Sequence, residues 1–293
     1  MDQLPKPKWN KVSLKRVWRA LGWIVITLTV VAFWYDFYLW NLSGGSDFDT
    51  ALLGEESYDD YSYDDCDIAG INLHGDLYTY VISDPETGSI GDVVGSEDVV
   101  YSIKAAEDNP DVKAILVEVD SYGGYPVAAE EIATALKSVT KPTVVQIRQA
   151  GLSAAYWAAT GADTIFASEL SDIGSIGVTQ SYVDASGYNQ KEGYIYNSLS
   201  TGKYKDMLDP EKPLTAEERA LLERDLQIVH EAFVKAVSEN RGLSISRVRA
   251  LADGSSMPGK MALENGLIDR IGGFSEVEEY LKELIDKEPV ICW

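Results

Sequence analysis

Short apolar runs alternate with amphipathic stretches along the chain from residue 68 onward. Strands are expected at the runs rich in branched apolar side chains, at 68–75, 113–120, 143–149 and 164–168. Helices are expected between and after them, at 96–108, 126–139, 154–162, 215–240 and 274–285. Strands that alternate with helices form parallel β–α units, so the pattern predicts a layered α/β domain.

Several of these helices carry recognisable end signals. Ser96 is a candidate N-cap of the first helix, and a proline two residues past that helix closes it. Thr215 and Glu218 form a capping box at the start of the long helix, and Gly242 ends it. One face of the long helix carries Leu222, Leu226, Val229, Phe233 and Val237. A glycine-rich turn is expected at 172–178, after the fourth strand.

A separate apolar stretch, 17–40, precedes this domain. Between Arg19 and Asp36 it has 16 residues without charge, and its aromatic flank brings it to the length of about 20 residues that a membrane span needs. All basic residues of this region precede the run, so the positive-inside rule puts residues 1–16 in the cytoplasm and the rest outside. The stretch predicts an uncleaved single-pass anchor in the cell membrane. A cleaved signal peptide is the alternative, but the segment after Ala32 lacks its small residues.

The segment 41–67 holds nine acidic residues and no Lys or Arg. Such a run repels itself and buries little surface, so it predicts a flexible linker, with an acidic docking segment as the alternative. The soluble domain is then expected over 68–285, with a tail at 286–293. The whole chain has a formal charge of -22, from 25 basic and 47 acidic residues. A surface this acidic repels phosphate backbones and argues against nucleic acid as a partner.

The two cysteines, Cys66 and Cys292, form neither a metal-ligand pattern nor a disulfide framework. Two free thiols are therefore the favoured interpretation. A disulfide that joins the edges of the domain is the alternative, and it requires an oxidising compartment. No metal and no cofactor is expected.

Two strand-to-helix turns are built from small residues, at 120–124 and 151–155. A serine in such a turn presents its hydroxyl at the sheet edge, and N–H groups at the start of the next helix favour an anion. Ser153 is therefore a candidate nucleophile. Gly123 or Gly124, together with the N–H of Ala154, could form the oxyanion hole that acyl transfer requires.

A serine nucleophile needs a base, and the two histidines fit this role poorly. His74 ends the first strand and His230 lies within the long helix, where structural or surface roles are expected. A lysine can replace histidine when burial keeps it neutral. The loop at 198–210 contains Lys203 and Lys205, and the residues alone do not choose between them.

Five segments, in a fixed order, resemble the signal peptide peptidase A family of serine–lysine peptidases, specifically its short forms of the S49 type. The segments are 117–124, 151–159, 172–178, 201–210 and 252–281, and the resemblance covers about 68–285. It implies a Clp protease/crotonase-like layered domain, which here would follow the one N-terminal transmembrane helix predicted at 17–40. It also implies a catalytic Ser153, a general base at Lys205, a supporting hydrogen bond from Ser175 to that lysine, and an oxyanion site at Gly123 and Gly124.

By this resemblance the protein is a serine endopeptidase that cleaves apolar peptides such as released signal peptides. The family's short forms assemble as rings in which serine and lysine meet across a subunit boundary, which implies a homo-oligomer. Two departures are present: Tyr122 stands where the family has proline, and Ala154-Ala155 replaces two glycines. A catalytically inactive ring scaffold is therefore the alternative. Acyl-CoA chemistry is disfavoured, because a domain outside the cytoplasm would not meet CoA.

Overall fold

The computed structural model describes residues 27–31, 34–35, 63, 65–81 and 92–293. The chain divides into two units, Met1–Tyr61 and Ser62–Trp293. In the first unit, residues 27–31 and 34–35 are helical. Most of the predicted anchor and most of the predicted linker lie outside the described residues. Within the described ranges, no helix combines the length and the apolar character that a membrane span requires.

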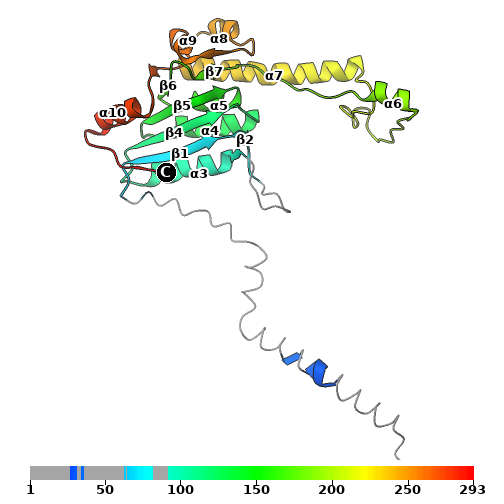
Figure 1. The fold of residues 1–293 in the computed structure, drawn as a ribbon, viewed down its shortest axis with the longest axis horizontal. Helices are drawn as coiled ribbons and strands as arrows, with labels where there is room; N and C mark the ends of the chain where they lie inside the picture. Colours follow the sequence, from blue (N-terminus) through cyan, green and yellow to red (C-terminus); the bar gives the residue numbers. More distant parts are fainter. Residues whose placement is uncertain (1–26, 32–33, 36–62, 64, 82–91) are drawn as a thin grey trace, which may run out of the picture. The chain divides into compact units, whose positions relative to one another are not determined.

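An eight-stranded and mainly parallel sheet forms the centre of the second unit (Figure 1). Its main path runs, from edge to edge, through β10 (Ile291–Cys292), β1 (Ile68–His74), β4 (Ala114–Ser121), β5 (Thr143–Leu152), β6 (Thr164–Ala167) and β9 (Arg270–Ile271). β7 (Asp172–Gly174) pairs with the end of β5, and β8 (Ser256–Pro258) lies antiparallel to β7. β2 (Asp76–Tyr78) and β3 (Val93–Gly95) form a small separate sheet. The predicted α/β class with a parallel sheet is confirmed.

Helices cover both faces of the central strands, which explains why those strands are apolar almost throughout. The larger core lies under α3 (Ser96–Asp108), α4 (Pro126–Ser138) and α5 (Ala154–Ala159). A smaller core forms where α10 (Phe274–Ile285) packs on the other face. Side chains alternate between the faces: Val145 belongs to the larger core and Val144 to the smaller one.

The remaining helices are α6 (Ser186–Glu192), α7 (Ala216–Arg241), α8 (Ile245–Leu251) and α9 (Gly259–Glu264). The predicted capping box of α7 is confirmed, and Gly242 ends the helix in a left-handed conformation with φ 64°. Only the C-terminal half of α7 packs on the core, where Phe233 stacks on Trp157 with ring centroids 5.0 Å apart. The N-terminal half extends beyond the sheet in Figure 1, and Ile228 in that half is 62% exposed.

Three predicted local features differ from the structure. Gly95, not Ser96, is the N-cap of α3, and Ser96 Oγ donates a hydrogen bond to the carbonyl of Thr79 instead. The third predicted helix is shorter, because α5 ends at Ala159. The predicted turn at 172–178 begins as strand β7, because β5 continues to Leu152 and supplies a pairing edge.

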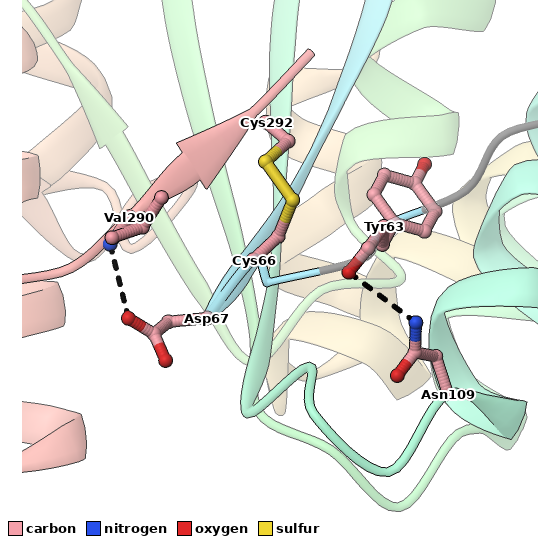
Figure 2. Close-up of a disulfide and its surroundings, with 6 residues drawn as sticks. All are labelled: Tyr63, Cys66, Asp67, Asn109, Val290 and Cys292. Carbon is pink, nitrogen blue, oxygen red and sulfur yellow. Dashed lines mark hydrogen bonds between the residues drawn. A yellow bond between two sulfur atoms is a disulfide. The ribbon is translucent and has the colours of Figure 1, made fainter.

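The expectation of two free thiols is wrong, because Cys66 and Cys292 form a disulfide with a Cα–Cα distance of 5.9 Å (Figure 2). β10 pairs with the start of β1, which brings the two cysteines together at the sheet edge. The Val290 N–H adds a 3.2 Å hydrogen bond to the Asp67 carboxylate. Residues 286–293, predicted as a tail, thus contribute an edge strand. A pairing across 226 residues leaves no local sequence signal, and a two-residue strand is too short to predict.

Candidate active site

Ser153 is the single residue between the last residue of β5 and the first residue of α5. Its backbone angles, φ 51° and ψ -122°, lie in a region that residues with a Cβ rarely adopt. Neighbouring groups hold this conformation: the Ser153 N–H donates to the Gly174 carbonyl over 2.8 Å, and the Trp157 N–H donates to the Ser153 carbonyl over 3.0 Å. A sharp turn of this kind presents a serine side chain at the carboxyl edge of a parallel sheet.

The glycine turn after β4 lies directly against this serine. A Cβ atom on Gly123 would be 2.9 Å from Ser153 Cβ and 3.2 Å from the Ala154 nitrogen, and the φ of Gly123 is +119°. Both features require glycine at this position. Gly124 is held from the other side, because β2 approaches so closely that a Cβ there would lie 2.2 Å from the Leu77 carbonyl oxygen. The structure therefore brings together the two turns that the sequence singled out separately.

The backbone N–H groups of these turns differ in their hydrogen bonds. The Gly123 N–H donates to Ser121 Oγ over 3.1 Å. The Gly124 and Ala154 N–H groups have no acceptor among the described residues. The carbonyl of Gly123 and the N–H of Tyr125 both bond Leu77, each over 2.9 Å, so β2 fixes the chain on either side of Gly124. Of the predicted donors, Gly124 and Ala154 are the two whose N–H groups are available.

Ser175 follows β7, and β7 pairs with the last residues of β5. The residue has a positive φ of 50°, and its N–H donates to the Ser255 carbonyl over 3.1 Å. Its hydroxyl donates to the Gly254 carbonyl over 3.1 Å. Ser175 is thus a neighbour of the Ser153 turn, since the preceding residue accepts the Ser153 N–H. Among the described residues, its hydroxyl forms no hydrogen bond with a lysine.

Lys205 lies in the exposed segment between α6 and α7. Its own N–H donates to the Gly202 carbonyl over 3.1 Å, and no hydrogen bond joins its ammonium to a described residue. Figure 1 shows α6 at the N-terminal end of α7, whereas α5 lies against the sheet. Within the described chain, no hydrogen bond joins Ser153 to Lys205. The structure thus does not bring the predicted serine and lysine together in one subunit.

The two candidate lysines have different electrostatic surroundings. Lys203 forms an ion pair with Glu217, and this hydrogen bond raises the pKa of Lys203. A raised pKa stabilises the ammonium, which is the opposite of what a general base requires. Lys205 has no such carboxylate partner among the described residues. Lys205 stays the predicted base on the strength of the family resemblance, because a surface ion pair of Lys203 does not by itself decide between the two lysines.

A charged cluster anchors the segment that contains Lys205. Lys212 contacts Asp206 over 3.2 Å and Glu218 over 2.7 Å. Glu218, which is nearly fully buried, also accepts from the N–H and the hydroxyl of Thr215, each over 2.9 Å. The hydrogen bond from Lys212 lowers the pKa of Glu218. Asp206, the residue next to Lys205, is therefore tied to the N-terminus of α7.

Sequence reasoning missed two residues that shape this site. Ser121 accepts the Gly123 N–H and orients the glycine turn. The short spacing between a serine and the glycine two residues later is typical of a side-chain-stabilised turn and was the available signal. Leu77 fixes Gly124 through backbone atoms alone. No side-chain pattern could have indicated that role.

The fold and this site define a parallel α/β protein with a strained serine beside a glycine turn. Residues 135–288, more than half of the chain, match the model of the family described as Peptidase family S49. The chain belongs to peptidase family S49. The matched range includes Ser153, Ser175 and Lys205 and begins after the glycine turn.

Curated relatives carry names that agree with this family. A putative protease of Methanocaldococcus jannaschii is 34% identical over 193 residues, which is 64% of this chain and 62% of the relative. A putative signal peptide peptidase SppA of Enterococcus faecium is 31% identical over 190 residues, which is 64% of this chain and 55% of the relative. A putative protease of Synechocystis is 31% identical over 193 residues, covering 65% of this chain and 69% of the relative. The chain thus spans less than two thirds of the first two relatives.

Proposed function

We propose that this chain is a membrane-anchored serine endopeptidase that cleaves apolar peptides such as released signal peptides. The observation that carries the proposal is the strained Ser153 turn, with Gly123 close against it. A positive φ at a residue other than glycine costs about 1–3 kcal/mol and persists only where the surroundings hold it, which is typical of functional sites. Membership of peptidase family S49 and the names of the relatives support the reaction class.

In the proposed reaction, Ser153 Oγ attacks the peptide carbonyl carbon while its proton passes to the neutral amine of Lys205. The N–H groups of Gly124 and Ala154 bind the oxyanion that forms. The tetrahedral intermediate then expels the amine product, which takes the proton from Lys205. A water molecule then attacks the carbonyl of the acyl-enzyme and gives a proton to Lys205. The ester bond breaks, and Lys205 returns the proton to Ser153 Oγ. No metal or cofactor is required.

Lys205 is proposed to reach Ser153 of a neighbouring copy of the chain in a homo-oligomeric ring. The segment around Lys205 is exposed in the single chain and carries large apolar side chains without cover, including Tyr194, Ile195 and Leu199. The N-terminal half of α7 is also exposed. A second copy that covers these groups would exclude water around the lysine, and desolvation favours the neutral amine that a base requires.

Residues 17–40 are proposed to anchor the domain in the cell membrane, with residues 1–16 in the cytoplasm and the peptidase domain outside it. The disulfide between Cys66 and Cys292 supports this orientation, since disulfides persist in oxidising compartments. A domain tethered there would lie next to the membrane, where apolar peptides such as released signal peptides are expected.

A cleavage assay with matched lysine variants tests the proposal. Full-length protein in detergent is incubated with a signal-peptide-like substrate. Ser153→Ala and Lys205→Ala are each expected to lower kcat/KM by on the order of 1,000-fold or more. Lys203→Ala is the matched control. Its kcat/KM is expected to stay within about threefold of wild type, because the ion pair of Lys203 with Glu217 lies on the surface.

Mixing the two inactive variants tests the shared site. After co-assembly, a site is complete only where a Lys205→Ala chain supplies serine and a Ser153→Ala chain supplies lysine. Random mixing at equal amounts then restores about a quarter of wild-type activity in a closed ring. If properly assembled wild type cleaves the substrate no more than Ser153→Ala, Ser153 is not the nucleophile, and absence of any cleavage favours the catalytically inactive ring scaffold.

A further inference from the structure

Three exposed tyrosines lie within or next to the glycine turn, at positions 78, 122 and 125. Tyr122 is 64% exposed, Tyr125 is 57% exposed and Tyr78 is 39% exposed. Tyr78 and Tyr125 pack against each other, with ring centroids 5.1 Å apart. Exposed aromatic side chains that gather next to a candidate active site are typical of a binding surface.

Tyr122 is held in place by a residue of the strand that leads to the nucleophile. Gln149 Nε2 donates a hydrogen bond to the Tyr122 hydroxyl over 2.9 Å. Gln149 lies in an irregular part of β5, where the register moves from Val119↔Ile147 to Ser121↔Gly151. Four residues of β5 therefore span the same distance as two residues of β4. Bulges of this kind redirect side chains, and this one turns Gln149 toward Tyr122.

Tyr122 and Tyr125 flank the glycine pair of the proposed oxyanion site. Tyr122 directly precedes Gly123, and a Cβ on Gly123 would lie 2.9 Å from Ser153 Cβ. Tyr125 directly follows Gly124, whose N–H is the proposed oxyanion donor. A peptide whose carbonyl reaches that N–H must run alongside residues on both sides of the glycine pair, so side chains next to the scissile bond come within reach of Tyr122.

We propose that Tyr122, fixed by Gln149, is a specificity-determining residue that contacts an aromatic or large apolar substrate side chain next to the scissile bond. The inference rests on the proposed peptidase function and adds a preference to it. A ring that is already held by a hydrogen bond loses little conformational freedom on binding. It offers one face for offset or edge-to-face packing with a substrate ring. Proline, which the resembling family has at this position, presents no aromatic face.

A selectivity measurement tests this inference. Full-length protein in detergent is given peptide pairs that differ only by Phe or Ala at one position around the cleavage site. The readout is the ratio of kcat/KM for the two peptides. Tyr122→Ala is expected to lower this ratio by about threefold to tenfold, the range that aromatic pairs are worth. Gln149→Leu, which frees the ring, is expected to lower the ratio by less, through a higher KM for the Phe peptide.

Tyr101→Ala is the matched control, because Tyr101 is an exposed tyrosine on α3 outside this group of three, and its ratio is expected to equal that of wild type. Tyr122→Phe keeps the ring and guards against a folding failure of Tyr122→Ala. An unchanged ratio in folded Tyr122→Ala overturns the inference. If Tyr122→Ala does not fold, Tyr122→Phe and Gln149→Leu decide, because both remove the hydrogen bond that holds the ring. An unchanged ratio in both of them then overturns the inference.

A fluorophosphonate probe separates this inference from the proposed function. If wild-type Ser153 is not labelled and no peptide is cleaved, the proposed function fails and this inference fails with it. Normal labelling with an unchanged ratio rejects only the role of Tyr122.

Discussion

Two residues shape the candidate site: Ser153 through its backbone conformation, and Gly123 through its lack of a side chain. Ser153 adopts a positive φ because its N–H reaches Gly174 and its carbonyl accepts from the first turn of α5. Gly123 allows the second turn to approach, since any Cβ there would meet Ser153. Each depends on the other, so the geometry is sensitive to an added methyl group.

Gly123→Ala is therefore expected to lower kcat/KM by about 100-fold, because a displaced reacting group loses its alignment. The substitution also places a Cβ at φ +119°, which is expected to lower the free energy of unfolding by about 1–3 kcal/mol. Gly187→Ala is the matched control, since a Cβ on that α6 residue meets no atom within 4 Å. Kinetics and thermal unfolding of both variants give the comparison. Full activity in folded Gly123→Ala contradicts the proposed close approach.

At the scale of elements, the start of α7 controls the segment that holds Lys205. Thr215 caps the helix, and the same Glu218 that completes the capping box binds Lys212, which in turn binds Asp206. This chain of contacts links the helix end to the loop. Without Glu218, the N–H and the hydroxyl of Thr215 would lose their acceptor. The loop that holds Lys205 would lose its link to α7 through Lys212.

The order of this helix start is expected to depend on pH. The hydrogen bond from Lys212 lowers the pKa of Glu218 in the folded state. The Glu218 carboxylate therefore stabilises the folded state fully above its pKa in the unfolded chain, about 4.3. This stabilisation is lost as the pH falls through the lower pKa that Glu218 has in the folded state. Hydrogen exchange at the first turn of α7, corrected for intrinsic rates, should show protection that declines in acid.

Glu218→Gln should remove most of this pH dependence, because the neutral amide cannot form the ion pair with Lys212. Glu223→Gln, at an exposed position of the same helix, serves as the control and should keep it. If protection at the start of α7 declines equally with pH in Glu218→Gln, the ion pair is not the cause.

The elements that could be predicted are those that carry a local signal. The strand at 113–120 and the helix at 126–139 follow from their apolar spacing, and the ends of α7 follow from Thr215 and Gly242. β7, β10 and the irregular register of β5 could not be predicted, because each exists only through a partner distant in sequence. The strained φ of Ser153 likewise depends in part on a contact distant in sequence, the hydrogen bond from its N–H to the Gly174 carbonyl.

At the scale of the domain, the disulfide and the candidate site lie at opposite edges of the sheet. β10 and Cys66 meet the start of β1, whereas Ser153 and the glycine turn follow the ends of β5 and β4. In a parallel sheet these are the amino and carboxyl edges. The disulfide is therefore expected to stabilise the domain without contacting the candidate site.

Replacing both Cys66 and Cys292 with serine is expected to lower the free energy of unfolding by about 2–4 kcal/mol, because the long closed loop is lost from the unfolded chain. Amides at 286–293 should lose protection first, while labelling of Ser153 by a serine-reactive probe should persist in the folded variant. Wild type under a reducing agent provides the second measurement. Loss of labelling from a domain that remains folded contradicts the proposed separation.

The two turns of the candidate site could be located from the sequence, whereas contacts between distant segments could not. The turns at 120–124 and 151–155 were recognisable from their small residues, and the fold places them in contact. The residues of the 198–210 loop alone do not choose between Lys203 and Lys205, and the assignment of the base to Lys205 rests on the family resemblance. The proposed meeting of Ser153 and Lys205 depends on a second copy of the chain, which no pattern within one sequence describes.

The most direct test of this account is to map a covalent serine probe on the assembled full-length protein. Wild type and Ser153→Ala are treated with a fluorophosphonate between pH 6 and 9, digested and analysed by mass spectrometry. We expect a single adduct on the peptide that contains Ser153, formed faster as pH rises because the base acts in its neutral form, and absent from Ser153→Ala. An adduct on another residue, or equal labelling of the two proteins, would contradict the assignment of Ser153 as the nucleophile.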